Sequence, residues 1–547
     1  MNQQSEPSHY GIGVDTGGTY TDAVLVDLNT LAVVQSAKRP STHHDLSIGI
    51  SEALAEVTRN VNVNEIKQIA FSTTLATNAI VEGKGASVGL VVIGHVKSFD
   101  LPVVSIRYIK GGHSFTGEEV DQLDIEALVD AINEWKGEMD AYAITSAMSF
   151  KNPTHEQVAE EAIKMLDSKP TFCSHRISSK PGMMERAGTA VLHARLMPVI
   201  SSFVDNLKTF SKKDLNAAKH TMIGGDAEPI NFDEAIIRAA NTVGSGPAAT
   251  SWFGAKATDK QSALVVDVGG TSTDVALILN GEPLLSSDGS TIGNWNTHVN
   301  AVEMETSGIG GDSLVQIDKD GRILVGPERV QPIATSTGIP NPESWLGKEI
   351  RSKCLMAPGN VSENETEENE ILQYLRKNGP TSPAELVAQL SMSEFTLERK
   401  TRELVFQRQI LESGFTPTDA LHALGQLDLG DSGIAKKAAQ VLAAACNQDT
   451  NDFCEEVLRL ARIKIKNAVL KTVFRKQTGK SLENFFTSDS NDPLLSVSFS
   501  LNVPIIGIGA AARLLLPEVS EMLGTEVIFP EHYEVGNALG AIMIASK

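Results

Sequence analysis

The chain has 547 residues, more than a single hydrophobic core holds, so we expect two or more domains. Hydrophobic residues make up 41% of it and charged residues 21%, which is ordinary for a globular protein. The formal net charge of −21 gives a surface that repels phosphate backbones and anionic lipid. We therefore expect neither nucleic acid nor membrane as a partner, and an anionic ligand would need a local site of backbone N–H groups and a metal ion.

The cysteines and the amino terminus bear on the cellular compartment. The four cysteines form no CxxC pair, so we expect free thiols in a reducing compartment. The first ten residues, MNQQSEPSHY, lack the apolar segment of a signal peptide. The most apolar run, Ile505 to Leu516, is too short for a membrane span and contains Arg513. These features predict a cytoplasmic protein.

Two related motifs are the strongest feature of the sequence. DTGGTYTD (Asp15 to Asp22) and DVGGTSTD (Asp267 to Asp274) are identical at six of eight positions. Apolar runs of strand length flank each motif, so each predicts a strand, a glycine turn and a second strand. A hairpin repeated at this separation predicts two related lobes.

Between the motifs, predicted strands alternate with predicted helices, which favours an α/β class. The predicted strands are Gln68 to Thr73, Ala86 to Gly94 and Ala141 to Ser146. The predicted helices are Thr74 to Lys84, Asp124 to Trp135, and Pro181 to Phe203, the last starting near Gly182 and interrupted at Pro198.

After the second motif, a polar segment from Ser362 to Glu412 predicts three short helices, in an arrangement that could be winged-helix-like. It contains ten acidic and six basic residues, a net charge of −4, which argues against DNA binding and favours a packing or partner-docking insert. The helices are predicted at Glu365 to Lys377, Ser382 to Leu390 and Ser393 to Gln407. Further helices are predicted at Ile434 to Cys446, Asp452 to Phe474 and Asn537 to Ile544, with a strand, glycine turn and helix over Val503 to Leu516.

The glycine turns of the two motifs carry the chemistry. Without a Cβ, successive backbone N–H groups form an anion-binding concavity, and threonine hydroxyls add donors. Asp15 and Asp267 end their strands, where a carboxylate holds Mg²⁺ directly or through water. Two such hairpins would clamp a triphosphate, whereas the plainer alternative is two β-turns that use glycine for geometry. The candidate phosphate-binding residues are Thr16, Gly17, Gly18, Thr19, Thr21, Gly269, Gly270, Thr271 and Thr273.

Three other glycine-rich segments are weaker candidates, since each also fits an ordinary tight turn. GIGAAARLL (Gly507 to Leu515) follows an apolar strand, and its Gly507, Gly509 and Ala510 are candidate adenosine contacts. GIGGDS (Gly308 to Ser313) offers Gly310 and Gly311 to phosphate or ribose. TVGSGPAA (Thr242 to Ala249) would point a helix amino terminus at phosphate.

From about residue 10 onward the chain resembles the A-type subunits of the hydantoinase/5-oxoprolinase family. The matching blocks are DTGGTYTDAVLVD, STTLATNAIVEGKGASVGLV, ERAGTAVLHARLMPVI, GSGPAAT, VVDVGGTSTDVAL, GIGGDS, GFTPTDALHALG, IGIGAAA and VGNALGAI. The resemblance implies a two-lobed actin-like ATPase (ribonuclease H-like) fold of the α/β class, with a nucleotide cleft between the lobes. It implies an N-terminal lobe at 9–183, a second lobe at 184–547 and the insert at 362–412.

The same resemblance implies a function, a cofactor and a partner. The function is ATP-dependent opening of a cyclic amide such as a hydantoin, 5-oxoproline or a lactam, through phosphorylation of the carbonyl oxygen. ATP and Mg²⁺ are the implied cofactors, with Asp15 and Asp267 at the metal–phosphate centre, and the implied partner is a hydantoinase B-type subunit. Two alternatives stay open: the ATPase subunit of an acetone or acetophenone carboxylase, and a non-catalytic ATP-binding sensor or scaffold.

The resemblance has limits, and some questions stay open. Longer family members carry a Pro/Gly/Cys-rich segment where this chain has the helical insert, so the substrate class is open. Homo-oligomerisation is left open as well. No further metal cluster is expected, because the candidate histidines, His43, His44, His95, His113 and His155, are scattered along the chain.

Overall fold

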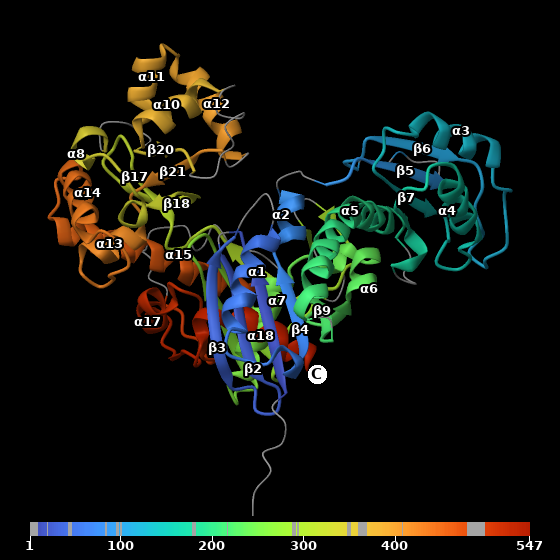
Figure 1. Cartoon of the computed structure of the whole chain (residues 1–547), viewed down its shortest axis with the longest axis horizontal. Helices are drawn as coiled ribbons and strands as arrows, with labels where there is room; N and C mark the ends of the chain where they lie inside the picture. The colour runs from blue at the N-terminus through green and yellow to red at the C-terminus, as the bar shows by residue number, and fades with distance from the viewer. Residues whose placement is uncertain are drawn as a thin grey trace, which may run out of the picture. The chain divides into compact units, whose positions relative to one another are not determined.

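The computed structural model describes residues 9–547 apart from 19, 42–45, 82–84, 95–97, 99–100, 178–181, 216, 287–290, 293–294, 347–351, 359–368, 407–408 and 479–497. Helices and strands alternate along the chain (Figure 1), which confirms the predicted α/β class. The chain divides into two compact units. The first comprises Met1–Gln261, Ile278–Glu303 and Val535–Lys547, and the second comprises Ser262–Leu277 and Met304–Glu534. The predicted two-lobed nucleotide cleft stays a prediction.

The first unit contains a mixed sheet with the strand order β10-β9-β4-β1-β2-β3. Strand β1 pairs antiparallel with β2 and parallel with β4, which confirms the hairpin predicted for the first motif. The strand bounds are β1 Tyr10–Thr16, β2 Tyr20–Asp27, β3 Val33–Pro40, β4 Ile66–Thr73, β9 Lys219–Ile223 and β10 Pro229–Asn231.

Glycines on one face of β1 allow a helix to pack directly on the strand backbone. A Cβ at Gly13 would lie only 1.9 Å from the carbonyl oxygen of Ala538 in helix α18 (Gly536–Ala545). Helix α18 meets helix α7 (Ser245–Lys256) equally closely, since a Cβ at Gly540 would lie 1.9 Å from the carbonyl oxygen of Ala249. Alternate residues of a strand share a face. Asp15 therefore follows Gly13 on the face that α18 covers.

This packing predicts that Gly13→Ala destabilises the protein. The added methyl group forces β1 and α18 apart, and overpacking of this kind costs about 1–3 kcal/mol. Thermal unfolding followed by circular dichroism should show a lower midpoint. The matched control is Gly308→Ala, where a Cβ would lie 3.4 Å from Pro327 in ordinary contact. Equal midpoints for the two variants would contradict the backbone-to-backbone packing.

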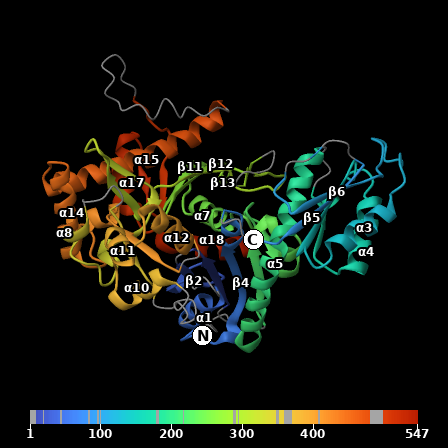
Figure 2. The same cartoon turned by 90° about the horizontal axis from the view of Figure 1, so that it is seen from above.

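The first unit also contains a parallel sheet with the order β6-β5-β7-β8. Helices α3 and α4 contribute to a core on one face, and α5 to a core on the other (Figure 2). The strand and helix predictions between residues 86 and 146 are therefore confirmed in type and approximate bounds. The bounds are β5 Val88–Ile93, β6 Ser105–Ile109, α3 Ile125–Trp135, β7 Ala141–Ser146, α4 Thr154–Leu166 and β8 Thr171–Cys173.

Helix α5 (Met183–Asp214) runs without a break through Pro198, so the predicted interruption is wrong. Proline costs a helix interior about 3 kcal/mol, because it removes one hydrogen bond and its ring crowds the preceding turn. Packing outweighs this cost here. Ala187, Ala190 and Val191 lie in the core of the parallel sheet, while Ile200 and Phe203 lie in the core of the mixed sheet.

By length and composition alone, the stretch Met183–Thr209 of α5 is the one described helix that could cross a membrane. Of its most apolar window, 67% is buried inside the structure, as in the core helix of a globular domain. This is weak evidence for a membrane span, and the expected cytoplasmic location stays a prediction.

The second unit repeats the core of the first. Strand β11 (Ser262–Val268) lies between β12 (Thr273–Leu279) and a parallel neighbour, β22 (Ile505–Ile508). As β4 leads into α2 (Leu75–Val81), so β22 leads into α17 (Ala512–Met522). The two turns close with the same hydrogen bond, 3.0 Å in each, from Gly17 N to Tyr20 O and from Gly269 N to Ser272 O. The second predicted hairpin is therefore confirmed, and its structure resembles that of the first.

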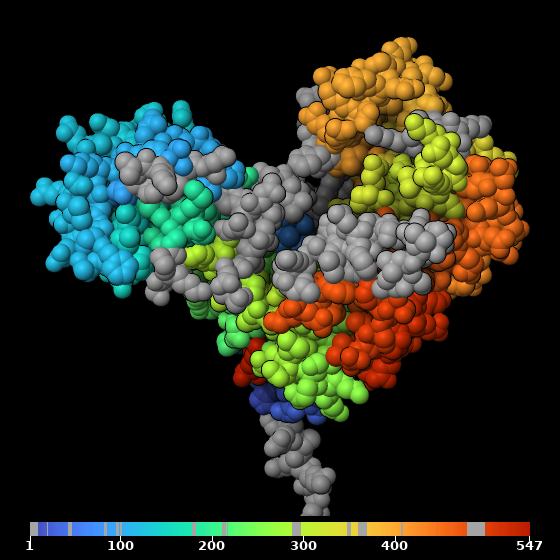
Figure 3. Space-filling model, turned by 180° about the vertical axis from the view of Figure 1, so that it is seen from behind, coloured from blue at the N-terminus to red at the C-terminus, as the bar shows by residue number. Residues whose placement is uncertain are grey.

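The polar segment of the second unit forms three helices with a hydrophobic core of their own. They are α10 (Glu370–Asn378), α11 (Pro383–Leu390) and α12 (Glu394–Phe406), and their side chains gather into one cap (Figure 3). The three predicted helices are therefore present, although the predicted start at Glu365 lies outside the described residues. Strand β20 (Cys354–Met356) pairs with β21 (Leu411–Gly414) beside them. The buried core comprises Leu355, Ile371, Leu372, Leu375, Leu386, Leu397, Leu404 and Ile410.

The remaining elements complete the two units. In the first unit they are α1 Leu46–Val57, α6 Phe232–Ile237, β13 Glu282–Pro283, β14 Thr291–Ile292 and β15 Trp295–Asn296. In the second they are β16 Met304–Ser307, β17 Ser313–Ile317, β18 Ile323–Arg329, β19 Gln331–Pro332, α8 Pro342–Trp345, α13 Pro417–Ala423, α14 Ser432–Ala445, α15 Thr450–Thr478 and β23 Val527–Ile528.

Candidate functional site

A row of polar side chains crosses the mixed sheet at the level of Asp15. The strand register places Ser72 beside Asp15, Asp15 beside Asp22, and Asp22 beside Lys38. The Ser72 hydroxyl donates a 2.6 Å hydrogen bond to Asp15 Oδ1, and Lys38 Nζ lies 2.9 Å from Asp22 Oδ1. Buried charges are costly unless they are paired or serve a function. This row is therefore the candidate functional site of the first unit.

Two helix amino termini meet the Asp15 carboxylate. Asn537, at the start of α18, donates a 3.2 Å hydrogen bond from Nδ2 to Asp15 Oδ2. At the start of α7, a Cβ at Gly246 would lie 3.3 Å from Asp15 Oδ1. Thr250 of α7 also hydrogen-bonds to Asn537 Oδ1 and so holds that amide in place. The positive ends of helix dipoles favour negative charge, so the two termini offset part of the cost of burying this carboxylate.

Burial governs the electrostatics of the two carboxylates. The pKa of Asp15 is raised to about 6, mainly by burial; the hydrogen bond from Ser72 opposes this rise and the charge of Asp22 adds to it. Burial also raises the pKa of Asp22, while Lys38 lowers it. The ionised form of Asp15 is therefore destabilised where it stands, and a cation beside it would relieve that cost.

The predicted residues of the first turn divide into two groups. The Thr16 hydroxyl is buried and has no hydrogen-bond partner within the described residues, and a Cβ at Gly18 would have no neighbour closer than 3.9 Å. These two positions are available to a ligand. In contrast, Gly17 N–H closes the turn, and the Thr21 hydroxyl lies 3.1 Å from that of Ser41, inside the structure. Thr19 lies outside the described residues.

In the second unit, the GIGGDS segment lies directly on the second turn. Gly311 N donates to Gly269 O at 3.1 Å, and Asp312 N donates to Gly270 O at 2.7 Å. A Cβ at Gly310 would lie 2.5 Å from Gly270 O, so the two backbones touch. This arrangement argues against the predicted ligand contacts through Gly310 and Gly311. The glycines are needed for close packing, and the Gly311 N–H already serves this structure.

Of the remaining predicted residues of the second turn, Thr273 is used in a hydrogen bond inside the structure. The Thr273 hydroxyl donates a 2.7 Å hydrogen bond to Ile309 O, which ties the turn to the GIGGDS segment. Thr271 is half-buried. Gly311 O in turn accepts hydrogen bonds from the Thr418 N–H at 3.0 Å and from the Thr418 hydroxyl at 2.8 Å. Three family blocks are thereby joined around the second turn.

The predicted adenosine segment also reaches the second turn. A Cβ at Gly509 would lie 2.4 Å from Asp267 Oδ1, and Gly509 has a φ of +94°, which favours glycine. Ala511 N donates to Val268 O at 3.1 Å, so the turn that contains Ala510 is fixed beside Asp267. Gly507 lies within β22, where a Cβ would lie 2.5 Å from the Phe529 ring. Gly507 is therefore a packing position, whereas Gly509 belongs to the Asp267 turn.

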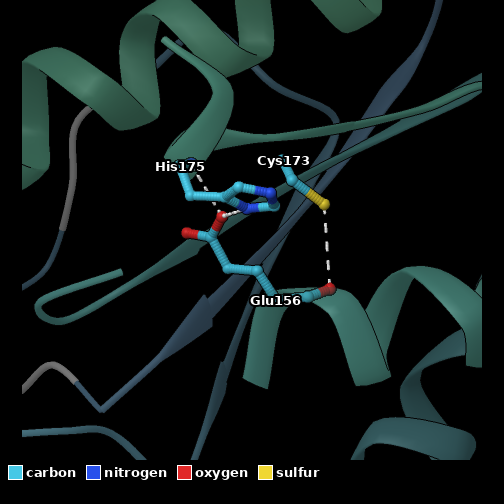
Figure 4. A group of neighbouring side chains, drawn as sticks. All are labelled: Glu156, Cys173 and His175. Carbon is cyan, nitrogen blue, oxygen red and sulfur yellow. Dashed lines mark hydrogen bonds and ion pairs between the residues drawn. The ribbon is translucent and has the colours of Figure 1, made fainter. Parts of the chain in front are cut away.

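Among the described residues, one group of metal-type ligands lies outside the two turns. It is formed by Glu156, Cys173 and His175, whose ligand atoms lie within 4.8 Å of one another (Figure 4). The Glu156 carboxylate already accepts hydrogen bonds from Ser146 N, Ser174 Oγ, His175 N and His175 Nδ1. Burial raises the pKa of the Cys173 thiol well above its usual range, which disfavours the thiolate that binds metals. Glu156 is thus a saturated structural carboxylate.

The histidine prediction needs a correction. His113 and His155 are far apart in sequence, yet their rings lie 4.2 Å apart, because the loop after β6 folds over the start of α4. His155 accepts from Gly112 N at 3.0 Å through Nδ1 and contacts Glu119 at 2.9 Å through Nε2. These two are therefore not scattered. His43, His44 and His95 lie outside the described residues.

Sequence reasoning missed four polar residues of these sites: Ser72, Asn537, Lys38 and Asp312. Three of them stand in blocks that the family resemblance had singled out, namely STTLATNAIV, VGNALGAI and GIGGDS. Lys38 had no sequence signal, since only the pairing of β2 with β3 places it beside Asp22.

Comparisons with known proteins identify the family of the chain. The family described as hydantoinase/oxoprolinase N-terminal region matches residues 11–166, and the family described as hydantoinase/oxoprolinase matches residues 186–545. The chain is 29% identical to the alpha subunit of the caprolactamase of Pseudomonas jessenii over 359 residues, which cover 58% of this chain and 50% of that protein. It is 29% identical to the acetophenone carboxylase gamma subunit of Aromatoleum aromaticum over 370 residues, covering 58% of this chain and 49% of that protein.

Among solved structures, the crystal structure of ATP-dependent caprolactamase from Pseudomonas jessenii superposes with a TM-score of 0.65 at 22% identity. The match covers 97% of this chain and 70% of that chain, and it shows a shared fold. The chain spans about half the length of the curated relatives it matches.

Proposed function

Because the chain belongs to the hydantoinase/oxoprolinase family, we propose that it is the ATP-using subunit of a cyclic amidohydrolase. The observation that carries this proposal is the Asp15 junction. Ser72, Gly246 and Asn537 come from three separate family blocks and converge on one buried carboxylate at two helix amino termini. In contrast to Glu156, whose carboxylate accepts four hydrogen bonds, Asp15 receives one side-chain hydrogen bond on each oxygen and stands beside the unpartnered hydroxyl of Thr16.

The residues of the first turn fit a magnesium–phosphate group. Asp15 offers a carboxylate whose charge is destabilised by burial, and Thr16 offers a buried hydroxyl that lacks a hydrogen-bond partner within the described part of the chain. We propose that Asp15 and Asp267 hold Mg²⁺, directly or through water, and that the glycine turns bind phosphate oxygens. ATP would supply a phosphoryl group to the amide carbonyl oxygen, which turns a poor electrophile into one that water attacks.

The substrate we propose is a small cyclic amide such as a lactam, a hydantoin or 5-oxoproline. Support comes from the similarity to the caprolactamase relative. That relative, the acetophenone carboxylase relative and the acetone carboxylase beta subunit of Xanthobacter autotrophicus are all named as subunits, so we also propose a partner of the B type.

A ketone carboxylase is the second candidate function. The specific observation in its favour is the similarity to the acetophenone carboxylase gamma subunit, which has the same 29% identity as the caprolactamase relative. Both candidates use the same chemistry at the turns, phosphorylation of a carbonyl or enolate oxygen. They differ in the acceptor and in the need for bicarbonate.

The test is ADP release by the purified protein, with and without a co-expressed B-type subunit. We expect release that depends on Mg²⁺ and on one member of a panel of lactams, hydantoins and 5-oxoproline. Release that depends on a ketone together with bicarbonate would favour the carboxylase. Calorimetry that detects no ATP binding to folded protein in the presence of Mg²⁺ would overturn the proposal.

A further inference from the structure

The GIGGDS segment carries one acidic side chain, Asp312, beside the second glycine turn. The backbone N–H groups of Gly310, Gly311 and Asp312 all form hydrogen bonds inside the structure, to Ser313 Oγ, Gly269 O and Gly270 O respectively. The segment therefore has no backbone donor left at these three positions for a phosphate. What it presents at the second turn is the carboxylate of Asp312.

That carboxylate lies against the turn itself. A Cβ at Gly270 would lie 2.3 Å from Asp312 Oδ2 and 2.9 Å from its carboxyl carbon, so only glycine at position 270 lets the carboxylate occupy this place. Its position is fixed from both sides, because Asp312 N donates to Gly270 O and Asp312 O accepts from Val330 N at 3.0 Å. Among the described residues, none donates a hydrogen bond to this carboxylate; burial raises its pKa to about 6, and the charge of Arg329 lowers it in part.

A carboxylate at this place has an electrostatic consequence. If the second turn binds phosphate, two negative groups share one small site, which is unfavourable unless a cation stands between them. Carboxylate and phosphate oxygens are the ligands that Mg²⁺ takes up together in nucleotide sites. The structural alternative, a carboxylate that supports the turn through hydrogen bonds, finds no such bond among the described residues.

We propose that Asp312 is a third cation-binding carboxylate, which holds at the second turn the Mg²⁺ that accompanies nucleotide phosphate there. This inference rests on the proposed function and adds a residue to it. The binding is direct or through one water molecule. This arrangement then requires glycine at positions 270 and 310, because a Cβ at either position would prevent the close contact between the GIGGDS segment and the turn.

The test compares nucleotide affinity with and without Mg²⁺. Calorimetry with a non-hydrolysable ATP analogue is performed on the full chain carrying Asp312→Asn, which keeps the size of the side chain against Gly270. We expect the affinity in Mg²⁺ to fall roughly 10- to 100-fold, the range for perturbed metal sites. In EDTA the affinity should stay unchanged or rise, because one negative charge beside the phosphate is gone.

The controls separate a cation role from a structural one. Asp320→Asn removes a carboxylate from the exposed β17–β18 turn of the same unit and should leave both affinities unchanged. Asp312→Glu should restore part of the Mg²⁺ effect, and thermal unfolding checks that each variant is folded. Equal losses in Mg²⁺ and in EDTA, or no loss in either, would overturn the role of Asp312. Absence of binding by the unaltered protein would instead overturn the proposed function, and this inference with it.

Discussion

Replacing Asp15 by Asn should lower ATP turnover by on the order of 10²-fold or more, the loss that follows removal of an electrostatic stabiliser of a transition state. Asn keeps the shape of Asp15 and can still accept the hydrogen bond from Ser72, but it brings no charge to Mg²⁺. Asp267→Asn should give a loss of the same order. ADP release under saturating ATP and Mg²⁺ measures both variants.

The same substitution should leave the free protein at least as stable as before. Burial raises the pKa of Asp15 from 3.8 to about 6. Since the unfolded chain then binds fewer protons, the free energy of unfolding falls as pH rises from 3.8 to about 6. At pH 7 the ionised carboxylate costs on the order of 3 kcal/mol. The amide of Asn would lose the hydrogen bond from Asn537 and place an unpaired N–H group there, a cost of about 1–3 kcal/mol that at most offsets this gain.

Thermal unfolding of nucleotide-free protein at pH 5 and pH 7 tests this second effect. The midpoint of Asp15→Asn should equal or exceed that of the unaltered protein at pH 7, and the difference should shift in favour of the unaltered protein at pH 5. Asp130→Asn, on the exposed face of α3, is the matched control and should change neither turnover nor midpoint. Near-normal turnover in both Asp15→Asn and Asp267→Asn would reassign the two carboxylates to structural roles in the turns.

The two hairpins could be predicted because their information is local. Asp15 and Asp267 each stand at the end of an apolar strand and before a glycine turn, and this pattern occurs twice. The hydrogen-bond partners of Asp15 could not be predicted in this way. Asn537 stands 522 positions away, and it reaches Asp15 only because Gly13 and Gly540 let α18 pack against β1 and α7. Packing of this kind leaves no periodic signal in a single sequence.

Two corrections have the same physical origin. Pro198 argues locally for a broken helix, but the cores of two sheets hold α5 on either side of it. His113 and His155 are unrelated in spacing, but the loop after β6 brings their rings into contact. In each case tertiary packing overrides a local preference of a few kcal/mol, which a reading of neighbouring residues cannot weigh.

Removal of the helical insert should separate nucleotide binding from partner assembly. The insert has its own core, and that core includes Leu355, which precedes the predicted start at residue 362, as well as Ile410 within the predicted end. Replacing residues 358–409 with a short Gly/Ser linker keeps β20 and β21 paired. The affinity for ATP should then stay within a few-fold, because no described contact of the two glycine turns comes from the insert. The complex with a B-type subunit should weaken by tenfold or more.

A milder variant keeps this prediction testable if the deletion does not fold. The Phe395 side chain, at the start of α12, is 77% exposed, although large apolar side chains are normally buried. Where an interface forms, large aromatic side chains are common anchors, and their truncation costs more than 1 kcal/mol of binding energy. Phe395→Ser should therefore weaken the complex, while Leu429→Ser, which alters a residue 75% exposed elsewhere in the same unit, should not. Size-exclusion chromatography and calorimetry with the B-type subunit measure both variants. Unchanged assembly after both the deletion and Phe395→Ser would place the partner on another surface.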